Sequence, residues 1–330
     1  MKPVLFALAD VTKMILQGKK LILAGDETIL QQLPSGHWIG GTIPYFMGEQ
    51  GGVLTREHIY VTELSSWAKR SVIQTYTTDS ISSIFADAPV NGFSMIIIPA
   101  TSAVHLSFAL NAPRYDGFAT RPLIGWISGV HLGDLGKISA KVFLGENSKV
   151  FEDRAVVMHV ELPERTYAEI NILNIFEQGS GDTITFPTDS FSATDAFING
   201  KKEDFAKYIV AKGLDTHLPL VANYSGAMIN TSFQNIDDAT KTVNFYAPVF
   251  KGVEYRHAKA VGDYVSSFTS HMPSHNLDSI FFSCNCILNY LYSELEGKQT
   301  GGITGPITFG EVAYQLLNQT MAYISLHQLV

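Results

Sequence analysis

Near the C-terminus, the spacing of the apolar residues changes from a strand pattern to a helix pattern. Residues 280–282 form a short apolar run that is typical of a buried strand. Beyond them, apolar side chains recur at the spacing of one helix face, at Cys284, Leu288, Leu291 and Leu295. Gly297 is the type of residue that ends a helix. The pattern predicts a strand, a tight turn at Ser283, Cys284 and Asn285, and a helix.

The same order of strand, turn and helix is predicted earlier in the chain. Phe93–Pro99 has the apolar character of a strand, and Ser102–Leu110 has helical spacing. Trp38–Thr42 reads as a strand that runs into a glycine-rich turn at Gly40, Gly41 and Thr42. Further helices are expected over Val4–Leu16, Ser80–Ala88 and Lys201–Lys212, and further strands over Leu21–Leu23, Ile59–Leu64, Leu123–Val130, Ala155–Glu161, Ala168–Phe176 and Val243–Phe250.

These elements predict a mixed α/β protein made of two related halves. Each half is expected to have a mixed or antiparallel sheet covered by helices, with the sheets packed together. Residues 176–200 are rich in Gly, Ser, Thr and Asp, which is typical of a connector. We therefore expect one half over residues 1–200 and the other over residues 201–330.

Composition narrows the classes of protein. The chain has 330 residues, of which 46% are hydrophobic and 16% are charged, so it can bury a large core. A net charge of −8 without a basic stripe argues against nucleic acid as a partner. The small charged fraction favours a homo-oligomer or a bound partner. No apolar stretch has the length of a membrane span, so we expect no membrane partner.

The cysteine count bears on the compartment. The two cysteines, Cys284 and Cys286, are one residue apart, a spacing that rarely forms a disulfide, and there is no third cysteine. This usage fits a reducing compartment, and we expect a cytoplasmic protein.

Several short motifs resemble the FIST domain family. They are the strand ending in Phe-Ser-Cys at residues 282–284, the Thr-Phe-Gly-Glu segment at residues 308–311, and the Gly-Gly-Thr element at residues 40–42. Residues 219–233 and 243–250 look like the strands that open the C-terminal half of that family. The resemblance implies FIST N-terminal-like and C-terminal-like halves. It also implies a cytoplasmic sensory protein that binds a small molecule and signals to a separate partner of kinase or cyclase type.

Three segments are the candidate ligand site. The resemblance points to Gly40, Gly41 and Thr42, to Ser283, Cys284 and Asn285, and to Phe309, Gly310 and Glu311. A helix start near Asn285 would offer N–H donors to an anionic group, and Glu311 could bind a cationic one, as an amino acid requires. For Glu311, a structural role in the loop before the last strands is an equal alternative. Asp134 and Arg121, in loops, are weaker candidates for lining a cleft.

Two other functions stay open. If the protein is an enzyme, Cys284 is the candidate catalytic residue, because a thiolate at a helix start can act as the nucleophile of a hydrolase or transferase. The alternative is that both cysteines are buried and unreactive. A zinc site is not expected, because C-x-C alone supplies too few ligands. No cofactor is predicted. A haem-binding gas sensor is the remaining alternative, with His37, His105 and His131 beside apolar segments as candidate ligands.

Overall fold

The computed structural model describes residues 4–224, 226–272 and 277–329. The predicted mixed α/β class is confirmed, since several mixed and antiparallel sheets pack together with short helices. The chain forms two compact units, which do not divide at residue 200. Unit 1 comprises residues 1–172, 272–316 and 321–330, and unit 2 comprises residues 173–271 and 317–320. Within the described ranges, no helix is long and apolar enough to cross a membrane.

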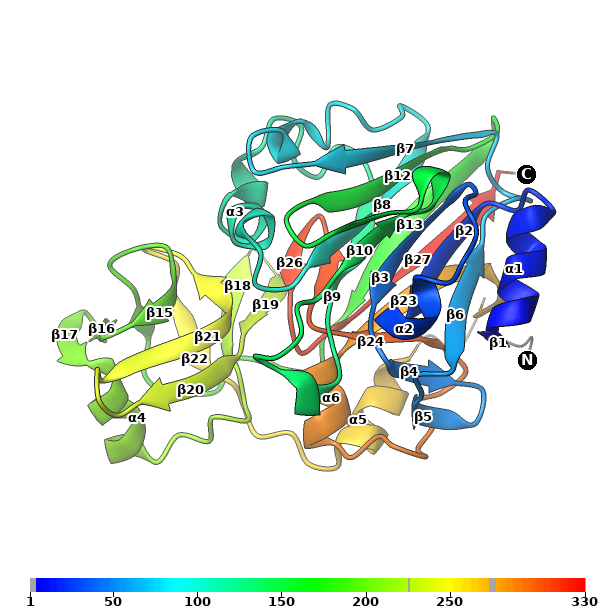
Figure 1. The fold of residues 1–330 in the computed structure, drawn as a ribbon. Coiled ribbons are helices and arrows are strands. Elements are labelled where there is room, and N and C mark those ends of the chain that lie inside the picture. The colour runs from blue at the N-terminus through cyan, green and yellow to red at the C-terminus, as the bar shows by residue number, and fades with distance from the viewer. Residues whose placement is uncertain (1–3, 225, 273–276, 330) are drawn as a thin grey trace. The chain divides into compact units, whose positions relative to one another are not determined.

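Unit 1 repeats one order of elements three times. In each repeat, two parallel strands are joined by a helix, a β-hairpin follows, and two further strands complete the set. The first repeat consists of β1 (Leu5–Ala7), α1 (Leu8–Leu16), β2 (Leu21–Gly25), α2 (Glu27–Leu30), β3 (Trp38–Thr42), β4 (Tyr45–Gly48), β5 (Gly51–Leu54) and β6 (His58–Glu63). These elements are labelled in Figure 1.

The second repeat follows directly. It consists of β7 (Arg70–Tyr76), η1 (Ile81–Ser83), β8 (Gly92–Pro99), α3 (Ala103–Asn111), η2 (Ala112–Arg114), β9 (Leu123–Ser128), η3 (Leu132–Asp134), β10 (Val142–Leu144), η4 (Gly145–Asn147), β11 (Lys149–Phe151) and β12 (Ala155–Glu161).

The third repeat is interrupted by unit 2. It begins with β13 (Thr166–Leu173) and resumes with η5 (Leu277–Ser279), β23 (Ile280–Cys286), α6 (Ile287–Tyr292), β24 (Gly305–Thr308), β25 (Glu311–Ala313), β26 (Gln315–Leu317) and β27 (Met321–Gln328). The two strand-turn-helix segments recognised in the sequence are β8–α3 and β23–α6, and β2–α2 is a third copy. The internal repetition thus takes a threefold form in unit 1.

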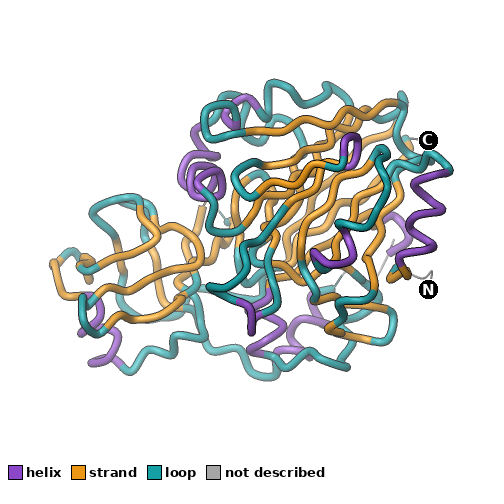
Figure 2. Tube along the Cα trace, viewed as in Figure 1, coloured by secondary structure: helices purple, strands orange, loops and turns teal. Residues whose placement is uncertain are grey.

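Each hairpin leaves its own repeat and completes the sheet of another. The strand orders are β1-β6-β2-β3-β10-β11, β7-β12-β8-β9-β25-β26 and β13-β27-β23-β24-β4-β5. The hairpin β10–β11 of the second repeat therefore joins the first sheet, β25–β26 joins the second, and β4–β5 joins the third. Figure 2 shows these strands in orange, with the purple helices at the outside. The exchange links the three repeats into one closed unit.

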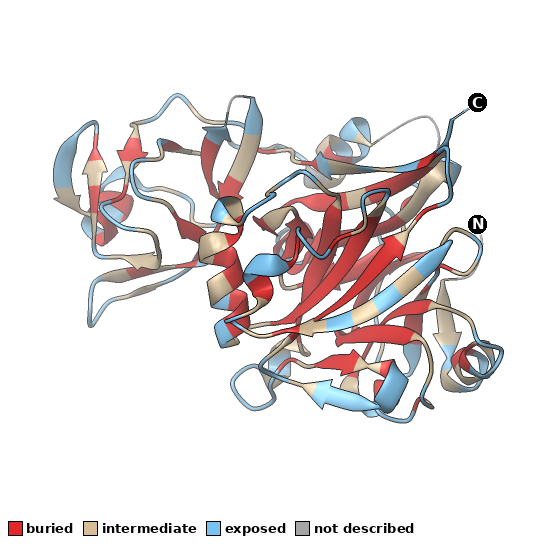
Figure 3. Cartoon of the chain, turned by 90° about the horizontal axis from the view of Figure 1, so that it is seen from above, coloured by how far each residue is buried: buried red, intermediate tan, exposed pale blue. Residues whose placement is uncertain are grey.

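The parallel pairs align in the same way in all three repeats. The last partners are Gly25 with Thr42, Pro99 with Ser128, and Cys286 with Thr308. Each second strand therefore ends at a hydroxyl side chain. The central strands of the sheets are buried on both faces and appear red in Figure 3, which fits their apolar sequences, whereas edge strands such as β7 are partly exposed.

Unit 2 has a core of its own. Its strands are β14 (Ile184–Thr185), β15 (Ser190–Ala193), β16 (Asp195–Ile198), β17 (Lys201–Asp204), β18 (Leu220–Tyr224), β19 (Ala227–Thr231), β20 (Phe233–Asp237), β21 (Thr242–Val249) and β22 (Tyr255–His257), with helices α4 (Phe205–Lys212) and α5 (Tyr264–His271). Phe186 makes edge-on ring contacts with Phe205, Phe245 and Tyr255. These aromatic side chains hold the two small sheets of the unit and α4 together.

Helical spacing mispredicted three segments, and two of them form strands instead. Residues 5–7 were expected to be helical, but they form β1 and pair with β6. Residues 201–204 likewise pair with β16 as β17, so that α4 begins only at Phe205. Over Ser80–Ala88, the regular helix is a single 3₁₀ turn at residues 81–83. In the first two cases, hydrogen bonding between strands outweighs a weak local preference for helix.

The two glycines of β3 face different surroundings, which allows a matched test of packing. A Cβ atom on Gly41 would lie 2.5 Å from Cγ2 of Ile97 and 3.1 Å from Nε1 of Trp126, in the neighbouring sheet. A Cβ atom on Gly40 would meet no atom closer than 3.3 Å. We expect Gly41→Ala to lower the free energy of unfolding by about 1–3 kcal/mol, because it overpacks the contact between two sheets.

The matched variant Gly40→Ala should cost clearly less in the same urea titrations. If the two variants lose the same free energy of unfolding, the close contact of β3 with the second sheet does not restrict the side chain at position 41.

Candidate functional site

The residues predicted from sequence all lie in unit 1, and the structure brings them together in its interior. Gly41 lies against β9, where Trp126 is the Cα partner of Glu311. The Thr308 hydroxyl donates to the Asn285 carbonyl over 3.3 Å and lies 3.5 Å from Oε1 of Glu311. Glu311 and Cys284 have no exposed surface. Most of these predicted residues therefore belong to the core. Of them, Thr42 borders the pocket that is described below.

Both predicted turns are strand residues. Ser283, Cys284 and Asn285 lie inside β23, and α6 begins at Ile287. Gly40, Gly41 and Thr42 lie inside β3. The expected helix start beside Cys284 was wrong, because residues 282–285 pair with β27 and the strand continues through them. Phe309 and Gly310 do form a link, between β24 and β25.

The thiol of Cys284 is not set up as a nucleophile. Its Sγ donates to the Gly125 carbonyl over 3.3 Å, and burial raises the pKa of Cys284 well above its ordinary value. The negative charge of Glu311 acts in the same direction. A protonated thiol without solvent access does not supply the thiolate that a cysteine hydrolase needs.

The three histidines considered as haem ligands lie in different surroundings. His37 is hydrogen-bonded to Glu146 and Ser71. His105 is buried in α3, and its Nδ1 accepts from the Thr101 amide over 3.2 Å. His131 stacks on the Tyr45 ring with 5.9 Å between centroids. The haem alternative stays a prediction.

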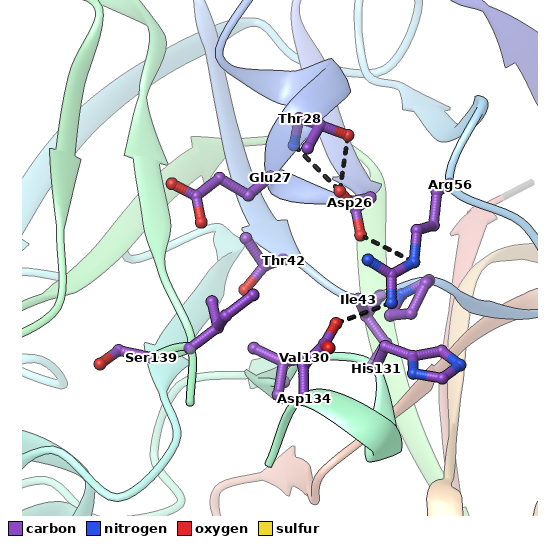
Figure 4. A pocket seen from close by; sticks show the side chains of 13 residues that line it. Asp26, Glu27, Thr28, Thr42, Ile43, Arg56, Val130, His131, Asp134 and Ser139 are labelled. Atoms are coloured by element: carbon purple, nitrogen blue, oxygen red, sulfur yellow. Dashed lines mark hydrogen bonds and ion pairs between the residues drawn. The ribbon is translucent and has the colours of Figure 1, made fainter. Parts of the chain in front are cut away.

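A small pocket lies where the parallel strands β2 and β3 of the first sheet and β9 of the second sheet end. The carboxyl ends of β2 and β3 form one side and the end of β9 forms the other, the position at which open α/β sheets commonly bind ligands. Its volume is about 60 Å³. We call it the Arg56 pocket, and Figure 4 shows its lining, which consists of Asp26, Glu27, Thr28, Thr42, Ile43, Pro44, Arg56, Gly129, Val130, His131, Asp134, Ile138 and Ser139.

One guanidinium group is held between two carboxylates of this pocket. Arg56 donates from Nη2 to Oδ2 of Asp134 over 2.7 Å, and its Nε lies 3.8 Å from Oδ2 of Asp26. The hydrogen bond to Asp134 raises the pKa of Arg56 further above its ordinary value. The Arg56 side chain is 43% exposed, whereas that of Asp26 is only 11% exposed. The charged groups therefore lie at the mouth and on the wall of the pocket.

Local hydrogen bonds fix the wall of the pocket. Oδ1 of Asp26 accepts from the backbone amide and the hydroxyl of Thr28, at 3.0 and 2.7 Å, which caps the short helix α2. The Thr42 hydroxyl accepts from the Lys141 amide over 2.9 Å. Lys141 also forms an ion pair with Glu27. These contacts keep polar side chains in place at the strand ends.

Sequence reasoning named three of the lining residues and missed the central one. Thr42, Asp134 and, as a possible haem ligand, His131 were candidates, but Arg121 donates to the Ala88 carbonyl, outside the pocket. Arg56 and Asp26 were not singled out. Asp26 lies directly after the apolar strand β2, a signal that could have been used.

A second hollow lies beside the edge strand β7. It is an open groove of about 580 Å³ lined by Arg70, Ser71, Val72, Gln74, Asp87, Pro89, Val90, Asn91, His159 and Glu161. Two lining residues bind the buried Tyr76, whose hydroxyl lies 3.0 Å from Oδ2 of Asp87 and 2.8 Å from Nε2 of His159. Nδ1 of His159 lies 2.7 Å from the Ser94 hydroxyl.

The protonation states in this chain follow from burial. Burial raises the pKa of Tyr76, as does its hydrogen bond to Asp87, so the phenol keeps its proton and donates to the carboxylate. Burial lowers the pKa of His159 to about 4, so the imidazole is neutral at pH 7. Nε2–H of His159 then donates to Tyr76, and Nδ1 accepts from Ser94. All four groups have hydrogen-bond partners, which fits a stabilising network.

The model of DUF6976, described as a family of unknown function, matches residues 6–327. The chain belongs to this family. The resemblance to FIST domains is thereby corrected, because the family match covers nearly the whole chain and is to DUF6976. The motifs behind that resemblance are short and apolar, and β23 shows that the Phe-Ser-Cys segment is ordinary buried strand. No curated protein matches the chain.

Both cysteines of this DUF6976 protein should be inert in the native state. Cys284 and Cys286 are at most 1% exposed and form no disulfide. We expect Ellman's reagent to detect no rapidly reacting thiol in the native protein and two thiols per chain after unfolding in guanidinium chloride. Stoichiometric labelling of Cys284 in the native protein would revive the cysteine-dependent enzyme.

The buried histidines predict how stability depends on pH. Burial lowers the pKa of both His105 and His159 from 6.5 to about 4. Between these values the unfolded chain binds protons that the folded chain does not, so stability falls as the pH falls from 6.5 towards 4. Near pH 5, each histidine adds up to about 1.4 kcal/mol per pH unit to this slope.

Urea titrations at several pH values would measure the slope. His159→Gln should remove about one proton from the uptake on unfolding, whatever its effect on stability at pH 7. An unchanged slope in the variant would mean that His159 is charged in the folded state.

Proposed function

We propose that this DUF6976 protein binds a small zwitterionic metabolite of the amino-acid type in the Arg56 pocket and acts as a ligand-responsive regulator. The observation that carries the proposal is the partly exposed guanidinium of Arg56, held between Asp26 and Asp134 at the carboxyl ends of parallel strands. Opposite charges are thus presented side by side within one small pocket. A ligand with one anionic and one cationic group matches that arrangement.

The two charges of such a ligand have separate partners. An anionic carboxylate would bind the Arg56 guanidinium, whose planar donors suit a carboxylate. An ammonium group would bind Asp134 or Asp26, and the hydroxyls of Thr28 and Ser139 are further polar groups of the lining. The volume of about 60 Å³ holds only a few water molecules, so the charged head would enter and a longer side chain would point outward.

The lining favours binding over catalysis at this pocket. Its histidine, His131, stacks on Tyr45 and accepts at Nδ1 from the Gly133 amide over 3.0 Å. Among the described lining residues, no hydroxyl is hydrogen-bonded to the imidazole, as the hydroxyl of an activated nucleophile would be. A polar pocket also argues against a purely structural module, because such a module needs no pocket.

Ligand entry would change the loop after β9. A ligand carboxylate on Arg56 competes with Asp134, the residue that ties η3 to the first repeat. Asp134 would then move from Arg56 to the ammonium group of the ligand, and the shifted surface segment would contact a separate signalling protein, of kinase or cyclase type. The ligand can shift the equilibrium between the two loop conformations only by the difference in its binding free energy for them.

A thermal-shift screen with amino acids tests the proposal. At about 100 times Kd, a ligand adds about 2.7 kcal/mol to the stability of the folded state, which gives a rise of several degrees in Tm. Arg56→Gln should abolish the rise, because the ligand carboxylate loses its partner. Asp134→Asn should weaken binding of amino acids more than binding of acetate, since only the former carry an ammonium group.

Arg154→Gln is the matched control, because the Arg154 side chain is 42% exposed, has an acidic neighbour and lies outside the pocket. This control should respond like the wild type. A ligand that stabilises Arg56→Gln as strongly as the wild type binds elsewhere, and the failure of all amino acids to raise Tm contradicts the proposal.

A further inference from the structure

Outside the Arg56 pocket, a serine, a histidine and a glutamate form a hydrogen-bonded series at the edge of unit 1. The Ser71 hydroxyl lies 2.7 Å from Nε2 of His37, and Nδ1 of His37 lies 3.0 Å from Oε1 of Glu146. In the sequence, Ser71 lies 34 positions and Glu146 lies 109 positions after His37. The fold of unit 1 therefore brings them together.

The carboxylate fixes the tautomer of the imidazole. An ionised carboxylate only accepts hydrogen bonds, so Nδ1 of His37 carries the proton and donates to Glu146. In the neutral ring, Nε2 is then the acceptor, and the Ser71 hydroxyl donates to it. This is the arrangement in which a histidine can remove the proton of a serine while a carboxylate orients the ring.

Packing holds the acid and the base in place. His37 directly precedes β3, and Glu146 lies in η4 between β10 and β11, a hairpin that pairs with β3. Gly145 lies against the Trp38 ring, so closely that a Cβ atom there would be 2.4 Å from it. The Gly36 amide also donates to the Gly145 carbonyl over 2.9 Å. The exchanged hairpin thus fixes Glu146 beside His37.

We propose that Ser71 is the nucleophile of a second site, which hydrolyses carboxylic esters. Ser71 lies on β7, the edge strand of the second sheet, and is half-buried, whereas His37 and Glu146 have side chains 27% and 46% exposed. Unlike the buried Ser94 of the His159 network, Ser71 is accessible to a substrate. A shallow surface site suits a reactive ester better than an amide, whose poorer leaving group demands more from the site.

The edge position also supplies a donor for the developing oxyanion. β7 pairs with β12 on one side only, and backbone N–H groups point alternately to the two sides of a strand. The N–H of either Ser71 or Val72 therefore points away from the sheet. A backbone N–H at or next to the nucleophile is a suitable donor to a tetrahedral oxyanion.

The reaction balances with water as the co-reactant. Oγ of Ser71 attacks the ester carbonyl while its proton moves to Nε2 of His37, and the imidazolium then protonates the leaving alcohol. Water attacks the resulting acyl-serine and gives its proton to His37, which returns a proton to Oγ as the carboxylic acid leaves. Glu146 is a positioning residue, because it acts through the imidazole.

Labelling by a fluorophosphonate, read by intact and peptide mass spectrometry, tests the nucleophile directly. We expect one adduct per chain, on Ser71, and hydrolysis of p-nitrophenyl acetate that Ser71→Ala abolishes. His37→Ala should lower the rate by about 10²–10⁴-fold. Glu146→Ala should lower it less, and Glu146→Asp should recover part of the loss, which a merely structural role would not require.

Thr75→Ala is the matched control, because Thr75 lies on the same strand and, by alternation, on the same face as Ser71. It should keep the labelling and the esterase rate. Circular dichroism and Tm check that each variant is folded. No adduct on Ser71, or an esterase rate that survives in folded Ser71→Ala, overturns the proposal. Both results leave ligand binding at the Arg56 pocket untouched.

Discussion

No sheet of unit 1 is complete within its own repeat. Every second parallel strand needs a neighbour on its free side, and in each case that neighbour is a hairpin from another repeat. β3 takes β10, β9 takes β25, and β24 takes β4. Because backbone groups at a buried edge must be paired, no repeat of this unit satisfies its hydrogen bonds alone. The remaining features depend on this closure.

The candidate sites follow from the same exchange. The loop after β9 carries Asp134 and then leads to β10, which pairs with β3, so the second repeat delivers an acidic residue to Arg56 of the first. The turn of that same hairpin carries Glu146 to His37. If this hairpin paired within its own repeat, neither Asp134 nor Glu146 would reach its partner in the first repeat. The chemistry on the surface is thus assembled by sheet pairing over long sequence separations.

Sequence patterns determined the buried strands well and the site poorly. Apolar runs such as Phe93–Pro99 favour a strand, since they are of strand length, rich in isoleucine and bounded by glycine and proline. The stretch around Cys284 was ambiguous, because Cys284 pairs with β27 but also has helical spacing to Leu288 and Leu291. Local spacing cannot show which distant strand competes for those hydrogen bonds.

The same limit explains why Arg56 was missed and Glu311 was overvalued. Arg56 lies in a polar loop without a sequence motif. It became a candidate only through its contact with Asp134, which is 78 residues away in the sequence. Glu311 lies in a distinctive short motif, yet its carboxyl group is enclosed in the core. Asp26 was within reach of sequence reasoning, since a polar residue after a buried parallel strand is a common site signal.

The same strand end occurs once in each repeat, in different surroundings. Thr42, Ser128 and Thr308 occupy matching places, and each carries a hydroxyl group. Only Thr42 borders the Arg56 pocket, while the others have no exposed surface. Beyond Ser128, Gly129 lies under the Phe309 ring. Of these three matching strand ends, the one at Thr42 leaves space that a small polar group could fill, whereas those at Ser128 and Thr308 are covered by protein.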